Sequence, residues 1–185
     1  VLIPVKYPEY ANRLTNLALL MRNPKRDHDL VALSVVYDDA NIDRQRAEGC
    51  KLLEQVTSYA ASADVKMHSQ LRVATNIANG IMHAFKEFRA TEVVIGMHMH
   101  FSDSTTFWGK FHQSLFNGLS RQIIMARLMQ PLSTLRRIVV CVPSRAQFEP
   151  GFYRWLERLS RLAENLDCRI AYHGRQDTLT RIRQY

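Results

Sequence analysis

Apolar and polar positions along the chain follow two periods. Short runs that are apolar at nearly every position, such as LVALSVVY at residues 30–37, are typical of strands buried on both faces of a sheet. Between these runs, apolar residues recur every three or four positions, which predicts amphipathic helices. Strands that alternate with helices favour a parallel sheet with right-handed crossovers and helices on both faces. We therefore predict an α/β fold, doubly wound around a five-stranded parallel sheet.

The first 128 residues contain five such runs and four helical segments. The third run alternates more than the others, so we expect it at the periphery of the sheet. Gly80 lies inside a helical segment and weakens that helix by about 1 kcal/mol relative to alanine. We therefore expect the glycine to allow this helix to pack closely on the sheet. The expected strands cover residues 1–5, 30–37, 65–73, 93–95 and 122–128, and the expected helices cover residues 8–21, 41–60, 76–88 and 107–119.

A second, shorter unit follows a linker at residues 130–134, the best candidate for a domain boundary. Beyond it, an apolar run at 138–142, a helical segment at 152–166 and a run at 169–172 repeat the order that opens the chain. We therefore predict one domain at residues 1–129 and a second, truncated unit of the same kind at residues 134–185. We expect no closing element in the charged segment at the end. Val1 lies within an expected strand, so we interpret the chain as a piece of a longer protein.

Composition narrows the class of protein. No apolar run approaches the roughly 20 residues that span a bilayer. The three cysteines lie far apart, so we predict neither a disulfide framework nor a thiolate metal site, and a reducing compartment is favoured. The net charge of +8 is uneven, because residues 134–185 hold ten arginines and no lysine against five acidic residues. Arginines on a helix surface are most often solvated, so binding of nucleic acid is the least favoured alternative and we predict no nucleic-acid partner.

The loop after Gly96 is the main candidate for a functional site. It follows a buried run and precedes a helical segment, and in parallel α/β sheets such loops lie at the carboxyl end of a strand and face a helix N-terminus. Ligands with phosphate or carboxylate groups bind there. The histidines at positions 98, 100 and 112, together with Asp103, lack the spacing of metal ligands. We therefore predict no metal site and interpret the histidines as hydrogen-bonding loop residues.

Signatures of catalysis do not occur in the sequence. It contains neither a G-x-S-x-G nucleophile motif nor a phosphate-binding P-loop motif, so we expect the protein not to be an enzyme. Phe107 and Phe111 share helical spacing with Leu115, which favours packing in the core over a stacking platform for nucleic acid. Binding of a ligand is therefore favoured over catalysis.

With this order of elements, the chain resembles the universal stress protein family, whose fold is doubly wound α/β with five strands. The nucleotide-binding members carry Gly, two residues, Gly, nine residues, and Gly followed by Ser or Thr. The spacing is kept here from Gly96 to Gly109, but Met99 stands at the second glycine position and Lys110 at the hydroxyl position. Those glycines let backbone N–H groups approach a phosphate, and Met99 is bulky. The loop therefore resembles a degenerate form of the motif.

The resemblance implies a nucleotide site, with ATP or another adenine nucleotide as the ligand and no metal. It implies contacts from the end of the first strand, from Val35 near the adenine, and from the glycine loop. Lys110 would act as a point charge in place of the lost hydroxyl, and Lys6 stands where an acidic residue is common. The implied nucleotide-binding residues are Pro4, Val5, Val35, Gly96, His98, Gly109 and Lys110.

More particularly, the chain resembles the cytoplasmic tail of a bacterial monovalent cation:proton (Na+/H+) antiporter. The stretches that carry this resemblance are LIPVKYPEYANRLTNLALLMR, RVATNIANGI and FWGKFHQSL. It implies a regulatory domain on the cytoplasmic side of the inner membrane, in the same polypeptide as a transmembrane antiporter domain, that senses a small ligand. The alternative is a structural or dimerisation module whose ligand site is lost, or a stand-alone stress protein.

The fifth expected strand, residues 122–128, bears on assembly. It would lie at an edge of the sheet, and its IIMA core is apolar, uncharged and free of proline, so it tends to recruit another strand. Members of the family commonly pair through this strand. We expect a homodimer or, preferentially, intramolecular pairing of the tandem units, with residues 123–126 and 138–142 in one shared core.

Overall fold

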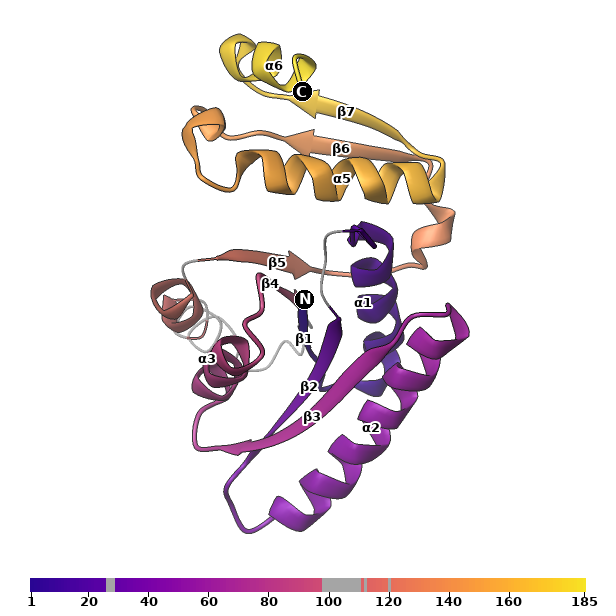
Figure 1. Cartoon of the computed structure of the whole chain (residues 1–185), viewed down its shortest axis with the longest axis vertical. Coiled ribbons are helices and arrows are strands. Elements are labelled where there is room, and N and C mark those ends of the chain that lie inside the picture. Colours follow the sequence, from indigo (N-terminus) through magenta and orange to yellow (C-terminus); the bar gives the residue numbers. More distant parts are fainter. Residues whose placement is uncertain (26–28, 98–110, 112, 120) are drawn as a thin grey trace. The chain divides into compact units, whose positions relative to one another are not determined.

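The computed structural model describes residues 1–25, 29–97, 111, 113–119 and 121–185. The chain divides into two compact units, each of which is described by itself (Figure 1). The first comprises Val1–Ala18 and His28–Met129, and the second comprises Leu19–Asp27 and Gln130–Tyr185. Among the described helices, none is both long and apolar enough to cross a membrane.

A five-stranded sheet forms the centre of the first unit, and its strands are all parallel. Its order is β3-β2-β1-β4-β5, which confirms the predicted fold class. Strand β3, the run that alternates more than the others, lies at an edge as expected. Leu2 pairs with Val31 of β2 and with Val93 of β4, so β1 lies in the middle. The strands are β1 (Leu2–Pro4), β2 (Leu30–Tyr37), β3 (Met67–Ala74), β4 (Glu92–Gly96) and β5 (Gln122–Ala126).

Helices cover both faces of this sheet. A Cβ atom on Gly49 would lie 2.8 Å from Ser34 Oγ, and a Cβ atom on Gly80 would lie 2.7 Å from Val35 Cγ1. Ser34 and Val35 are neighbours in β2 and point to opposite faces, so the helices that carry the two glycines pack on opposite faces. Gly80 thus permits the close packing that the sequence suggested. The helices are α1 (Pro8–Met21), α2 (Ile42–Ser62), which carries Gly49, and α3 (Ile77–Glu87), which carries Gly80, and residues 113–118 are also helical.

A hydrophobic core lies under α3. Strand residues such as Leu2, Leu33 and Val93 pack there against Ile81 and Phe85 of α3. Three buried side chains from the stretch before β5 belong to the same cluster, and these are Phe111, Leu115 and Leu119. The core role predicted for Phe111 and Leu115 is therefore confirmed. Phe107, which was predicted to pack with them, lies outside the described residues.

A two-stranded parallel sheet forms the second unit, with β6 (Arg137–Cys141) beside β7 (Arg169–His173). Between them runs α5 (Phe152–Leu166), whose bounds are those predicted. Val142, Ala146, Phe152 and Leu156 are buried together, and partly buried residues, Trp155 among them, pack against this cluster. Short 3-10 turns occupy Leu132–Thr134 and Ala146–Phe148.

The end of the second unit differs from the prediction that no closing element follows β7. Gln176–Arg183 form a helix, α6. Asp177 lies in its first turn and Arg181 in its last, and both charges complement the helix dipole. Thr178 is fully buried, and its hydroxyl donates a hydrogen bond to Gln147 Oε1 at 2.6 Å. Charged and polar residues dominate this helix, so its apolar period is too weak to be seen in the sequence.

Candidate functional site

The carboxyl ends of the parallel strands form one edge of the first unit's sheet, where ligands bind in α/β proteins. Strand β1 ends at Pro4, β2 at Tyr37, β3 at Ala74 and β4 at Gly96. The residues that directly follow these strands therefore gather at this edge. They include Lys6 after β1, as well as Thr75 and Asn76 after β3.

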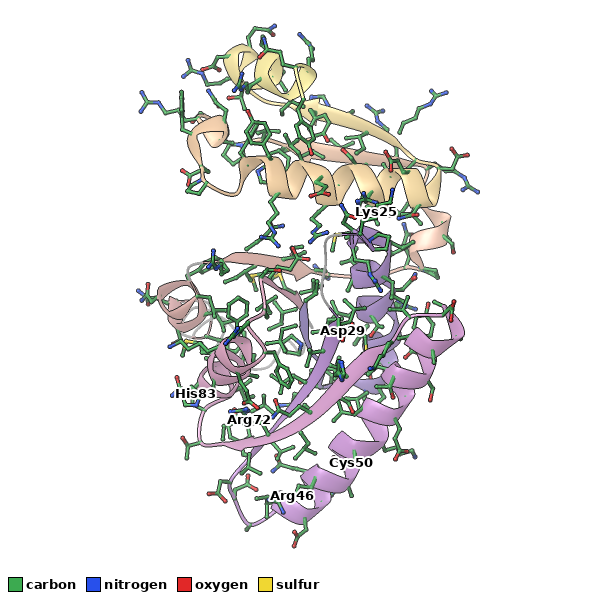
Figure 2. The ribbon with its side chains drawn as sticks, in the orientation of Figure 1. Lys25, Asp29, Arg46, Cys50, Arg72 and His83 are labelled. Atoms are coloured by element: carbon green, nitrogen blue, oxygen red, sulfur yellow. The ribbon has the colours of Figure 1, made fainter. Side chains whose placement is uncertain are left out.

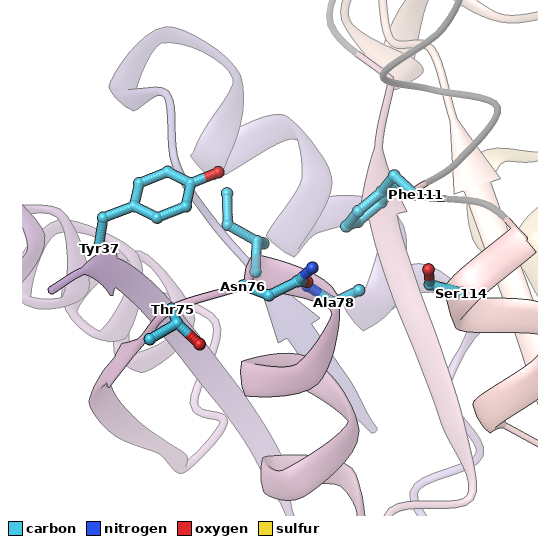
Figure 3. Close-up of a pocket in the computed structure, with 7 residues that line it drawn as sticks. Tyr37, Thr75, Asn76, Ala78, Phe111 and Ser114 are labelled. Atoms are coloured by element: carbon cyan, nitrogen blue, oxygen red, sulfur yellow. The ribbon is translucent and has the colours of Figure 1, made fainter.

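A pocket of about 230 Å3 opens at this edge, at the N-terminus of α3. Figure 3 shows the rings of Tyr37 and Phe111 on either side of it, with Asn76 and Ala78 between them. Its volume lies below the roughly 300–1,000 Å3 that drug-sized ligands occupy, so it suits a single ring system. The lining residues are Tyr37, Thr75, Asn76, Ile77, Ala78, Phe111 and Ser114.

Asn76 decides what kind of group the pocket accepts. It is the N-cap of α3, and its Oδ1 accepts hydrogen bonds from the backbone N–H groups of Ala78 at 2.8 Å and Asn79 at 3.3 Å. Those N–H groups are therefore satisfied and are not offered to an anion. No described residue accepts a hydrogen bond from the Asn76 Nδ2 group. The pocket thus presents an amide donor and hydroxyls between two aromatic rings, which suits the polar edge of a flat ring better than a phosphate.

A positive charge lies next to the pocket. Lys6 is exposed, and its Nζ lies 5.8 Å from the ring centroid of Tyr7 and 5.9 Å from that of Tyr37. A cation at this distance is attracted by the electron-rich faces of both rings. Since Tyr37 also lines the pocket, a ligand held there has the ammonium nearby. The edge therefore favours a ligand that joins a flat ring to an anionic group.

The loop between β2 and α2 holds Tyr37 in position. The backbone N–H of Tyr37 donates to Gln45 Oε1 at 3.0 Å. Gln45 Nε2 in turn donates to Asp39 Oδ1 at 2.9 Å, and Asp39 Oδ1 also accepts from the backbone N–H of Asn41 at 2.8 Å. This network ties the end of β2 to the first turn of α2, so the ring of Tyr37 projects from a fixed backbone.

The structure locates four of the residues implied by the resemblance. Pro4 ends β1, and the backbone N–H of Val5 donates to Leu33 O at 2.8 Å, which continues the pairing of β1 with β2. Gly96 ends β4. Val35, implied near an adenine, is half-buried in β2, and its side chain lies against Gly80 of α3. The other three implied residues, His98, Gly109 and Lys110, lie outside the described residues, as do His100, Asp103, His112 and Met99.

Most of the pocket was missed by sequence reasoning. Asn76 was recognised only as a helix start and Phe111 only as a core residue, although Phe111 both packs in the core and lines the pocket. Tyr37 was assigned to a buried strand with no further role. The signal that could have indicated this edge is an aromatic residue at the last position of a strand, followed by acidic residues. Across the part of the chain that the structure describes, no three His, Cys, Asp or Glu side chains lie together in a way that could hold a metal.

Comparisons with known proteins identify the fold. No protein-family model and no curated protein matches the sequence. Among solved structures, the universal stress protein from Archaeoglobus fulgidus gives a TM-score of 0.54 at 16% identity, over 67% of this chain and 95% of that one. A universal stress protein in complex with cAMP gives a TM-score of 0.53 at 9% identity, over 68% of this chain and 96% of that one. The chain therefore has the α/β fold of the universal stress proteins.

A transporter domain shares this fold over a longer stretch. The cytoplasmic domain of a prokaryotic cation chloride cotransporter gives a TM-score of 0.54 at 12% identity, over 92% of this chain. The match covers 64% of that domain, so this chain spans less than two thirds of its length. The fold of this chain thus occurs both in universal stress proteins and in a cytoplasmic domain of a membrane transporter.

Proposed function

We propose that the first unit binds an adenine nucleotide and that the chain is the cytoplasmic regulatory domain of a membrane transporter. The observation that carries this proposal is the pocket between Tyr37 and Phe111 at the carboxyl edge of the sheet. Solved universal stress proteins in complex with dAMP and cAMP support the ligand class. The likeness to the cotransporter domain supports attachment to a transporter. Within that class we propose a bacterial monovalent cation:proton antiporter, on the resemblance of the opening stretch LIPVKYPEYANRLTNLALLMR.

In the proposed complex the base occupies the pocket, where Tyr37 and Phe111 contact its two faces. Asn76 Nδ2 donates a hydrogen bond to a ring nitrogen, and the hydroxyl of Ser114 reaches the ring edge. The phosphates extend along the carboxyl edge of the sheet, where Lys6 attracts their negative charge. Every one of these contacts orients a ligand, and none activates a nucleophile, so the proposed role is binding without catalysis.

Regulation then follows from linkage. A ligand shifts a conformational equilibrium only by the difference between its affinities for the two states. If the attached transport domain has two states that hold the edge of this sheet differently, bound nucleotide favours one of them. The same reasoning predicts that the transporter's state alters the affinity for nucleotide by the same factor.

Calorimetric titration and thermal unfolding with AMP, dAMP, cAMP, ATP and cyclic dinucleotides test the proposal. A nucleotide at 100 times its Kd stabilises the first unit by about 2.7 kcal/mol. Ser114→Trp fills the pocket at an exposed position and is expected to abolish the shift. Ser58→Trp, at an exposed position of α2 on the opposite face of the sheet, is the matched control and retains it. Absence of any shift, or equal loss in both variants, rejects the proposal.

A structural or dimerisation module is the second candidate. Strand β5 is the last in the sheet order, and its five residues, QIIMA, carry no charge and are each half-buried. Such an edge accepts a strand from a second copy or from the tandem unit. In this case no nucleotide stabilises the chain, and a fragment of residues 1–130 dimerises or aggregates in sedimentation at micromolar concentration. A monomeric, well-behaved fragment contradicts this candidate.

A further inference from the structure

The β6–β7 sheet of the second unit has one face turned toward α5 and one open face. Val140 and Tyr172 are paired in register and lie on the α5 side. Both pack against the buried cluster that includes Phe152 and Leu156 of α5, and Tyr172 is hydrogen-bonded to Ser160. Alternate residues of each strand point to the other side. There are three such residues in each strand, and of these six residues five are exposed and Ala171 is half-buried. We call this surface the open face, and it consists of Arg137, Val139, Cys141, Arg169, Ala171 and His173.

The centre of the open face is apolar. Val139 is 54% exposed although it lies in the middle of a strand, and it pairs in register with Ala171. Parallel sheets occur almost only where both faces are covered, usually by helices. A valine at the centre of a parallel sheet is therefore expected to have a covering element in the functional assembly.

One end of the open face carries a repulsive pair of charges. Arg137 and Arg169 pair in register on adjacent strands, so their side chains leave the same face side by side. Like charges in this arrangement are destabilising. Neither guanidinium forms an ion pair with any described residue, and the six residues of the face include no acidic side chain. An occupant with carboxylates would relieve the repulsion and give each guanidinium a partner.

We propose that the open face binds an amphipathic helix that carries carboxylates beside an apolar stripe. The five positions from Arg137 to Cys141 span about 13 Å, which corresponds to about nine residues of a helix. The apolar stripe covers Val139 and Ala171, and the carboxylates lie over the Arg137 and Arg169 pair. This interaction does not depend on the nucleotide site of the first unit.

Other occupants fit the face less well. A second copy that used the same face would bring more cationic side chains to Arg137 and Arg169 and no carboxylate. An anionic membrane or a nucleic acid would satisfy the two guanidinium groups, but neither supplies a shaped apolar surface for Val139. These three occupants are distinguished by the test.

Cys141 lies in the open face and is exposed, so its alkylation by a maleimide reports coverage. Cys50, exposed on α2 of the first unit, serves as the internal reference (Figure 2). The probe is a stapled helical peptide of about twelve residues with glutamates on one side and leucines on the other. We expect it to slow alkylation of Cys141 in the full chain without affecting Cys50. The same peptide with lysine in place of glutamate is expected to leave both rates unchanged.

Charge reversal gives the sharper test. Arg137→Glu with Arg169→Glu is expected to weaken binding of the glutamate peptide about tenfold or more and to create binding of the lysine peptide. Arg181→Glu with Arg183→Glu makes the same change of charge on exposed residues of α6 and is the matched control, with little effect expected. Val139→Ser keeps all charges and is expected to weaken binding through loss of apolar contact. Circular dichroism melts verify that each variant folds.

Several results would overturn the proposal. One is absence of peptide binding, and another is equal weakening in the two double variants, which would indicate unspecific attraction. Protection of Cys141 by vesicles containing phosphatidylserine, or by single-stranded RNA, in preference to the peptide would assign the face to those partners. If sedimentation shows a dimer, and the Arg137→Glu and Arg169→Glu changes alter that dimer, the open face is assigned to a second copy of the chain.

Discussion

The two units begin with the same order of strand, helix and strand but differ in how their strands are covered. In the first unit, β2 reads LVALSVVY, and every residue is buried or half-buried between α2 and α3. In the second unit, β6 reads RIVVC and is exposed at every other position. The apolar residues of β6 would suit a strand covered on both faces. An uninterrupted apolar run therefore predicts two covered faces, and the exposed alternate residues of β6 depart from that expectation.

The largest expected contrast between the units comes from truncating one apolar side chain in each. Ile81 is fully buried under the first sheet, so Ile81→Ala should lower the free energy of unfolding by about 2–5 kcal/mol. Val139 is 54% exposed, so Val139→Ala should change it by no more than about 0.5 kcal/mol. Urea denaturation of the full chain measures both. Similar losses in the two variants would mean that the open face is covered in solution.

Close helix packing gives the next largest effect. In Gly80→Val the new side chain begins 2.7 Å from Val35 Cγ1 and 3.2 Å from Ala74 Cβ, so α3 must move away from the sheet. Overpacking of this kind costs about 1–3 kcal/mol. Ser58→Val places the same β-branched residue at an exposed position of α2 and should cost about 0.5 kcal/mol or less. If the two variants unfold at the same urea concentration, α3 does not pack closely at Gly80.

The order of elements was predictable because it depends on periods that the sequence displays. The run at residues 30–37 and the helix at 152–166 have the bounds that their patterns predicted, and the peripheral position of β3 followed from its alternation. Gly80 was also interpretable, because a glycine inside a good helix needs a packing reason. Local patterns therefore carried the fold class.

The pocket was less predictable because it depends on side chains from three separate segments. Tyr37, Asn76 and Phe111 become neighbours only when parallel strands bring their carboxyl ends together. Each residue also has an ordinary structural role, as strand end, helix cap or core residue, and this role conceals the second one. Helix α6 was missed for a related reason, since its stabilising contacts, such as Thr178 to Gln147, join residues far apart in the sequence.

The repulsive arginine pair of the open face should give a smaller effect of opposite sign. Arg137→Ser removes one of two like charges that lie side by side, so it should raise the free energy of unfolding by about 0.2–1 kcal/mol at low salt. The gain should shrink at high salt, because screening weakens the repulsion in the wild type. Arg183→Ser on α6 is the control and should show no comparable gain. A destabilised Arg137→Ser variant would show that Arg137 has a favourable partner.

Tyr172 should give the smallest effect, confined to alkaline pH. Burial raises the pKa of its phenol above the ordinary value of about 10, the hydrogen bond with Ser160 lowers it, and interaction with Tyr185 raises it. The folded state therefore holds this proton more tightly than the unfolded state. Its contribution to stability is complete below about pH 10 and is lost as the pH rises through the folded-state pKa.

Hydrogen exchange of the β6 and β7 amides across this pH range, in wild type and in Tyr172→Phe, measures the contribution of Tyr172. The phenylalanine variant should lose less protection than the wild type as the pH rises above about 10, because it has no proton to release. Ser160→Ala should have the opposite effect, since the hydrogen bond that lowers the Tyr172 pKa is removed and the gap between the folded and unfolded pKa widens. If wild type and Tyr172→Phe decline in parallel, ionisation of Tyr172 is not linked to the stability of the second unit.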